Sequence, residues 1–68
     1  MTREEIIKLE HYLKRVFRSP EIQVRQRPRK EDSAEVYVGE EFVGVVFEDE
    51  DGDGSFMFEM AILAEDLP

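Results

Sequence analysis

The sequence predicts an α+β domain in which one N-terminal helix packs on a four-stranded antiparallel meander sheet. Apolar residues recur at helical spacing near the N-terminus, and four later segments alternate apolar and polar residues. The connections between these segments are short, which favours antiparallel neighbours. Because the chain has only 68 residues, we expect a single domain over residues 1–68.

The helix is expected over residues 3–18. Thr2, followed three residues later by Glu5, has the pattern of a capping box at a helix start. One helix face carries the apolar residues Ile6, Leu9, Leu13, Val16 and Phe17. Since a helix of this length is marginal by itself in water, its apolar face is expected to pack on the sheet. Pro20 stops the helix.

The first two strands and their turn are read from alternation and breaker residues. Ile22 and Val24 alternate with polar residues in a strand that ends at Pro28, and residues 29–33 are expected to form a polar loop. Residues 34–38 alternate again. The pair Gly39-Glu40 then has the pattern of a two-residue type II′ hairpin turn.

This turn predicts a register for the central hairpin. It pairs Tyr37 with Phe42 and Val36 with Val43. The residues expected on the core face are then Ala34, Val36, Val38, Val43, Val45 and Phe47. After an acidic connection at residues 49–54, a fourth strand is expected over residues 55–63.

One helix covers one side of such a sheet, so the other side is expected to stay open. In the predicted register that outer face carries the apolar residues Tyr37, Phe42, Val46, Met57 and Leu63. A solvated sheet face is usually polar, and a contiguous exposed apolar patch commonly marks an interaction site. The face is therefore interpreted as a site for a protein partner or a second copy. The alternatives are that the 64–68 tail folds back over it, or that the exposed apolar residues have no role.

Charge is segregated along the chain, whose net charge is −8. Residues 1–30 carry all nine basic side chains and a net charge of +5, whereas residues 31–68 carry −13. Acidic strands could neutralise the basic 14–30 segment within the fold, or this segment could contact phosphates. The residues of such a nucleic-acid (RNA) contact would be Arg18, Arg25, Arg27, Arg29 and Lys30.

No constellation of residues indicates catalysis, a cofactor or a small-molecule substrate. The chain has no cysteine and one histidine, and no serine has an identifiable base at local spacing. The loop of Asp49, Asp51, Asp53 and Gly54 resembles the start of an EF-hand, but Met60 stands where that pattern needs a bidentate glutamate. A solvated loop is therefore favoured over weak divalent-cation binding. We expect no enzyme, no metal site and no cofactor.

No apolar run approaches the length of a membrane-spanning helix, and the charged start has no pattern of a secretion signal. No membrane association is expected, and a cytoplasmic location is the default. The combined interpretation is a non-catalytic protein-interaction module that uses the outer sheet face, and RNA binding is the alternative.

Two segments carry a family resemblance. The helix opening EEIIKLEHYLKRVF and the stretch from Arg27 to Leu63, with the block DSAEVYVGEEFVGVVFEDEDGDGSFMFEMAIL, are similar to the small alphaproteobacterial family called domain of unknown function 3126. The resemblance covers nearly the whole chain. It implies a stand-alone bacterial cytoplasmic protein of this length, and it transfers no activity, cofactor or catalytic residue.

Overall fold

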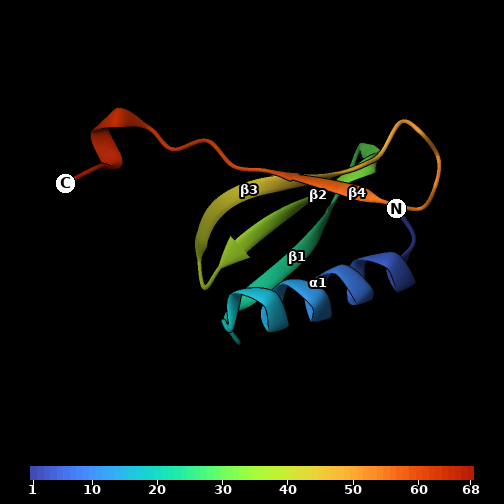
Figure 1. Cartoon of the computed structure of the whole chain (residues 1–68), viewed down its shortest axis with the longest axis horizontal. Helices are drawn as coiled ribbons and strands as arrows, with labels where there is room; N and C mark the ends of the chain where they lie inside the picture. The colour runs from blue at the N-terminus through green and yellow to red at the C-terminus, as the bar shows by residue number, and fades with distance from the viewer.

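A computed structural model describes residues 1–68 and contains one helix packed on one antiparallel sheet, as predicted. The elements in chain order are α1 (Arg3–Phe17), β1 (Ile22–Arg27), β2 (Lys30–Val38), β3 (Glu41–Glu48), β4 (Phe56–Glu59) and the short 3₁₀ helix η1 (Ala64–Asp66). The strand order in the sheet is β1-β2-β3-β4 (Figure 1). Each strand therefore pairs with its neighbour in sequence, which is the expected meander.

The ends of α1 follow local chemistry. The Thr2 hydroxyl accepts a hydrogen bond from the Glu5 backbone N–H (3.1 Å), and the Glu5 carboxylate accepts one from the Thr2 backbone N–H (2.8 Å). These two bonds are the predicted capping box. At the other end Arg18 adopts a left-handed conformation with φ 51°, so that α1 ends at Phe17, one residue before the predicted end.

The central hairpin begins as predicted and then departs from the predicted register. Gly39 has φ +61° in a two-residue turn, and Tyr37 pairs with Phe42. Beyond that pair a β-bulge inserts one extra residue in β3, and Val36 pairs with Gly44 instead of Val43. Because side chains alternate between the two faces, this single insertion exchanges the faces of all later residues in β3.

Because of the bulge, the prediction is wrong for one residue of the interaction face, Val46. Val46 points toward α1 and is only 1% exposed, so it belongs to the core and not to the outer face. Val45 and Phe47, which were predicted in the core, lie on the outer face with Tyr37. The prediction failed because the turn sets the register only up to the bulge.

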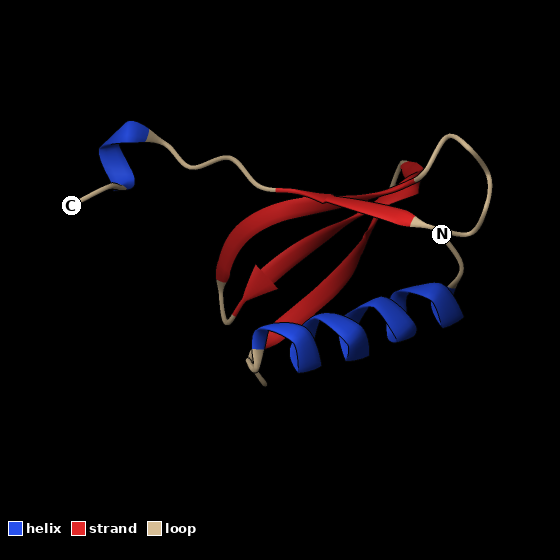
Figure 2. Ribbon diagram, viewed as in Figure 1, coloured by secondary structure: helices blue, strands red, loops and turns tan.

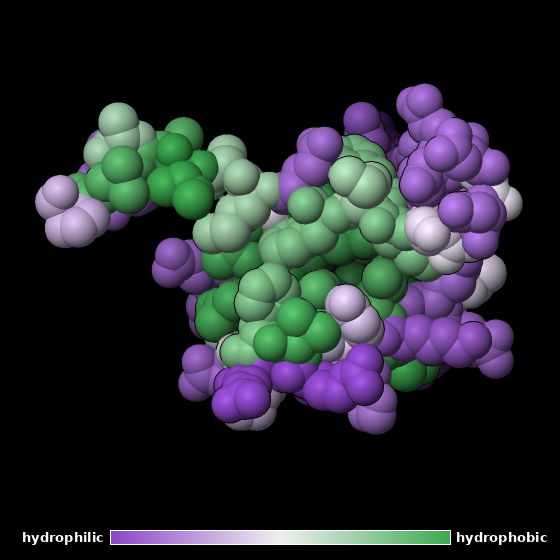
Figure 3. All heavy atoms as spheres, viewed as in Figure 1, coloured by the Kyte–Doolittle hydropathy of each residue, from purple (hydrophilic) through white to green (hydrophobic).

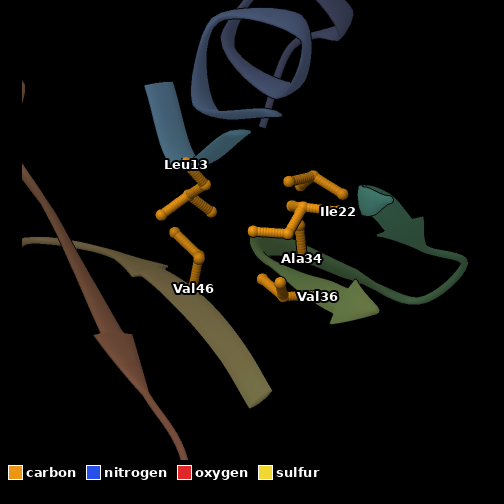
Figure 4. Close-up of a cluster of buried hydrophobic side chains, with 6 residues drawn as sticks. Leu13, Ile22, Ala34, Val36 and Val46 are labelled. Carbon is orange, nitrogen blue, oxygen red and sulfur yellow. The ribbon is translucent and has the colours of Figure 1, made fainter. Parts of the chain in front are cut away.

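The core lies between α1 and the first three strands. Its buried apolar residues are Leu13, Ile22, Val24, Ala34, Val36 and Val46 (Figure 4). The helix is tied to the sheet edge by the Glu10 carboxylate, which accepts a hydrogen bond from the Val24 backbone N–H (2.9 Å). Because α1 lies along β1 (Figure 1), the expected packing residue Phe17 is still 55% exposed.

β2 is longer than predicted. It starts at Lys30, so most of the expected 29–33 loop is strand. Ser33 is buried opposite Phe47, and its hydroxyl accepts a hydrogen bond from the Arg27 guanidinium (3.1 Å). This bond gives the buried Ser33 hydroxyl a hydrogen-bond partner, so that its burial in β2 leaves no unpaired polar group.

β4 is shorter than predicted and ends at Glu59. The bulge bends β3, whereas the chain after β4 continues nearly straight, so the two separate (Figure 2). Residues 60–68, called the tail below, leave the sheet and end beyond η1. Leu63, predicted in the fourth strand, therefore lies in the tail. The tail does not fold back over the sheet face.

Candidate interaction surface

Strand pairing defines the outer sheet face, the side of the sheet away from α1. One row across the strands contains Gln23, Tyr37 and Phe42. The next row contains Arg25, Glu35, Val45 and Glu59, and a third contains Ser33, Phe47 and Met57. Apolar side chains thus occur in every row, and charged side chains are concentrated in the middle one.

Tyr37 is fixed by contacts on several sides. Its ring meets the Phe42 ring edge to face, with centroids 5.7 Å apart. The Arg25 guanidinium carbon lies 4.0 Å from the Tyr37 ring centroid. The Tyr37 hydroxyl donates a hydrogen bond to Glu35 (3.1 Å), and the Arg25 guanidinium donates two to the Gln23 side-chain oxygen (2.9 and 3.2 Å). This network holds the aromatic ring in place.

An open groove lies where the tail separates from β3. Its apolar lining comes from Phe42, Val43, Gly44, Val45, Phe47, Met60, Ala61 and Leu63. The carboxylates of Glu59 and Asp66 border it. The groove joins the outer sheet face at Phe42 and Phe47. The predicted interaction residues Phe42 and Leu63 therefore line the same groove. Leu63 does so from the tail and not, as predicted, from the fourth strand.

A further apolar area is visible on the side of the molecule drawn in Figure 3, between α1 and β4. Hydrophobic atoms extend along the tail and across the middle of this view, with hydrophilic atoms around the rim. On the helix side of the sheet, the Phe17 and Phe58 rings meet edge to face with centroids 6.2 Å apart. Phe17 covers the inner side of β4 only partly, because α1 lies along β1.

The basic residues predicted for RNA contact are spread over the molecule. Arg18 caps α1 just before the start of β1, whereas Arg29 and Lys30 follow the end of β1. The six residues of β1 span about 20 Å and separate the two positions. Arg25 stacks on Tyr37, and Arg27 donates its hydrogen bond to Ser33. The structure does not gather these five side chains into one site.

Direct ion pairs do not neutralise the basic segment. The one ion pair between side chains joins Lys14 to Glu10 (3.8 Å) within α1, and the Met1 amino group lies 3.7 Å from Glu48. The other eight of nine lysine and arginine side chains have no carboxylate within 4 Å. Most basic side chains thus lie on the surface without a direct carboxylate partner.

The acidic 49–54 loop is held by its own hydrogen bonds. The Asp49 carboxylate accepts one from the Asp51 backbone N–H (3.1 Å), and the Asp53 carboxylate accepts one from the Ser55 backbone N–H (2.9 Å). The latter bond lowers the pKa of Asp53. No group of three or more His, Asp or Glu side chains is arranged to hold a metal ion. No helix has the length and apolar character needed to cross a bilayer.

Sequence reasoning missed Val45 and Phe47 on the outer face. The available signal was Gly44, because a glycine inside an alternating strand often marks a bulge or a close backbone approach. Both occur here. Gly44 is buried next to the bulge and against β4.

These features define a small α+β domain with a half-covered sheet, whose outer face carries both apolar and charged side chains. The chain belongs to the family described as "Protein of unknown function (DUF3126)", whose family model matches residues 5–66. No curated protein and no solved structure matches the chain. The family description assigns no activity.

Proposed function

We propose that this protein is a non-catalytic protein-interaction module that binds its partner through the outer sheet face. The observation that carries the proposal is a set of apolar side chains on that face, which occur in every row across the strands: Tyr37, Phe42, Val45, Phe47 and Met57. Phe42 and Met57 are 51% and 55% exposed. Aromatic residues and methionine are the types enriched at interface cores, where their burial contributes most to affinity.

The fixed position of Tyr37 supports the same proposal. A side chain already held by Phe42, Arg25 and Glu35 loses little conformational freedom when a partner covers it. The groove beside Phe42 offers an apolar depression with Glu59 and Asp66 at its border. An apolar partner segment flanked by basic side chains complements this surface.

A comparison of partners retained by single variants tests the proposal. Tagged wild-type, Phe42→Ser and Met57→Ser chains are used for affinity capture from the native host, and the captured proteins are quantified by mass spectrometry. Ile7→Ser is the matched control, because Ile7 is equally exposed but lies on α1. The expected result is a partner lost from both sheet-face variants and retained by the control. Equal capture by all four folded chains contradicts the proposal.

A further inference from the structure

The tail combines exposed apolar side chains with negative charge. Met60, Ile62, Leu63 and Leu67 are each more than half exposed, and Glu65 and Asp66 lie between the last two of them. Residues 60–62 make no backbone hydrogen bonds. The next residue along the chain that makes one is Leu63. The chain therefore presents an acidic, apolar segment that nothing in the same protomer covers.

α1 presents a surface of the opposite charge. Its solvent side has a shallow concavity with the side chains of Lys8, His11, Tyr12, Arg15 and Arg18, called the basic helix surface below. Tyr12 is 53% exposed, and the Arg15 guanidinium carbon lies 5.5 Å from its ring centroid. Lys8, Arg15 and Arg18 have no carboxylate within ion-pair distance. An acidic segment with apolar side chains complements this surface in both respects.

The protomer exposes more surface than a compact monomer of its mass. Such a monomer exposes about 4,450 Å² by the usual scaling with mass, whereas this chain exposes 5608 Å². The excess, about 1,150 Å², is larger than the roughly 800 Å² that each partner buries in a standard interface. The radius of gyration, 12.3 Å, also exceeds the roughly 10.9 Å expected for this length. The area available is sufficient for a stable dimer.

We propose that two copies of this chain form a symmetric dimer in which the tail of each lies on the basic helix surface of the other. Figure 1 shows the tail leaving the same end of the molecule at which α1 ends, with β3 and the hairpin turn between them. The tail therefore points away from its own helix. A two-fold axis at this end lets both tails engage at once, which closes the assembly as a dimer.

A second copy fits this surface better than a nucleic acid does. A nucleic acid carries one charge per phosphate along its whole length, so a chain of net charge −8 repels it more strongly than it repels a second copy of charge −8. The contact with the second copy needs only the local positive charge of the basic helix surface. In the dimer Glu65 and Asp66 face Arg15 and Arg18, and Leu63 and Leu67 lie against Tyr12. This contact shares Leu63 and Asp66 with the groove but uses none of the outer-face residues Tyr37, Phe42, Val45, Phe47 and Met57.

Charge exchange tests the proposal. The helix variant carries Arg15→Glu and Arg18→Glu, and the tail variant carries Glu65→Lys and Asp66→Lys; all four side chains are exposed. Sedimentation equilibrium near physiological ionic strength, where the long-range repulsion between two chains of −8 is screened, should give a wild-type dimer. The dimer should weaken at high salt, where the local charge pairs are screened as well. Each variant alone should dimerise at least about tenfold more weakly, because exposed charge pairs contribute modestly but four occur per dimer.

The decisive sample is the equimolar mixture of the two variants. In a mixed dimer the acidic tail of one chain meets a basic helix, and the lysine tail of the other meets an acidic helix. Dimerisation should therefore recover to within a few-fold of wild type. A chain that carries Glu50→Lys and Asp51→Lys makes the same change of charge at the opposite end of the molecule and should behave as wild type.

Four results would overturn the proposal. They are a wild-type chain that stays monomeric near physiological ionic strength, variants that still dimerise, a mixture that does not recover, and a dimer abolished by Phe42→Ser but not by the charge variants. The last result would assign self-association to the outer sheet face, and so separates this inference from the proposed function. If the wild type is monomeric and the helix variant alone loses binding to a labelled RNA, the surface is a nucleic-acid site. Circular dichroism checks folding, and Arg15→Gln with Arg18→Gln replaces any reversal that unfolds the helix.

Discussion

Gly44 lies directly against the backbone of Glu59, at the point where the tail separates from β3. A Cβ atom at residue 44 would collide with the Glu59 carbonyl oxygen and would lie 2.7 Å from Cε1 of Phe58. The missing side chain therefore permits the close approach of β4 to the bulged part of β3. Since Phe58 packs against the core, this approach also positions one side of the apolar cluster.

The variant Gly44→Ala is expected to lower the free energy of unfolding by about 1–3 kcal/mol, the usual cost of overpacking. The sign is informative, because alanine in a strand is normally favoured over glycine by roughly 0.5–1 kcal/mol. Urea unfolding followed by circular dichroism measures the change. Glu41→Ala, at an exposed position of the same strand, is the control. A Gly44→Ala chain as stable as wild type would show that β4 is not held at this distance.

The capping box should make a measurable contribution to stability. In Thr2→Ala the Glu5 backbone N–H loses its hydroxyl acceptor, and loss of such a cap costs about 1 kcal/mol. Urea unfolding at neutral pH checks this value. Ser19→Ala is a comparison at the other end of α1, where no hydrogen bond of the Ser19 side chain occurs, and it should have a smaller effect.

The same cap predicts an acid-sensitive contribution. The hydrogen bond from the Thr2 backbone N–H lowers the pKa of Glu5 below its ordinary value of 4.5. Because the folded-state pKa is the lower one, the stabilisation is complete above about pH 4.5 and is lost as the pH falls through the folded value. The stability difference between wild type and Glu5→Gln should therefore be constant near neutrality and shrink in acid. A difference that is independent of pH down to pH 2 would contradict this assignment.

The bulge predicts that two adjacent valines differ in how much they contribute to the free energy of unfolding. Val46 is buried in the core, so Val46→Ala should cost about 1.5–3 kcal/mol, whereas Val45→Ala on the outer face should cost much less. Parallel urea titrations of the two variants measure the difference. A larger loss for Val45→Ala would indicate the unbulged register, in which Val45 faces the helix.

The features that were predictable from the sequence are those set by near neighbours. The cap at Thr2, the turn at Gly39 and the pairing of Tyr37 with Phe42 each depend on a few consecutive residues, and all three are present. The meander also follows from short connections. Local chemistry was therefore sufficient for the fold class and for the start of the central hairpin.

The composition of the candidate site was less predictable, because it depends on contacts between distant residues. The bulge beside Gly44 accommodates β4, which approaches from fifteen residues further along the chain. This contact exchanges Val45 and Val46 between the faces, and alternation by itself carries no signal of it. The same bend ends β4 at Glu59, so Leu63 reaches the groove from the tail and not from a strand.

The contact between Arg25 and Tyr37 provides a last test. It distinguishes stacking on the aromatic ring from ion pairing with Glu35 as the main interaction of the Arg25 guanidinium. The guanidinium carbon lies 4.0 Å from the ring centroid, and the same guanidinium donates to Gln23. Glu35 is its cross-strand neighbour but forms no ion pair with it. Arg25 thus stabilises the ring chiefly by stacking.

A double-mutant cycle with Arg25→Ala and Tyr37→Leu should give a coupling free energy of about 0.5–1 kcal/mol, as expected for an exposed cation–π pair. The coupling should persist in Glu35→Gln, since the carboxylate is not the partner of the guanidinium. If the coupling instead disappears in Glu35→Gln, the charge pair is the main interaction. Because Arg25 supports Tyr37, reversing its charge should weaken binding of a protein partner at Phe42 as well as any contact with phosphate. Loss of RNA binding in such a variant therefore needs a Tyr37→Leu comparison before it is attributed to charge.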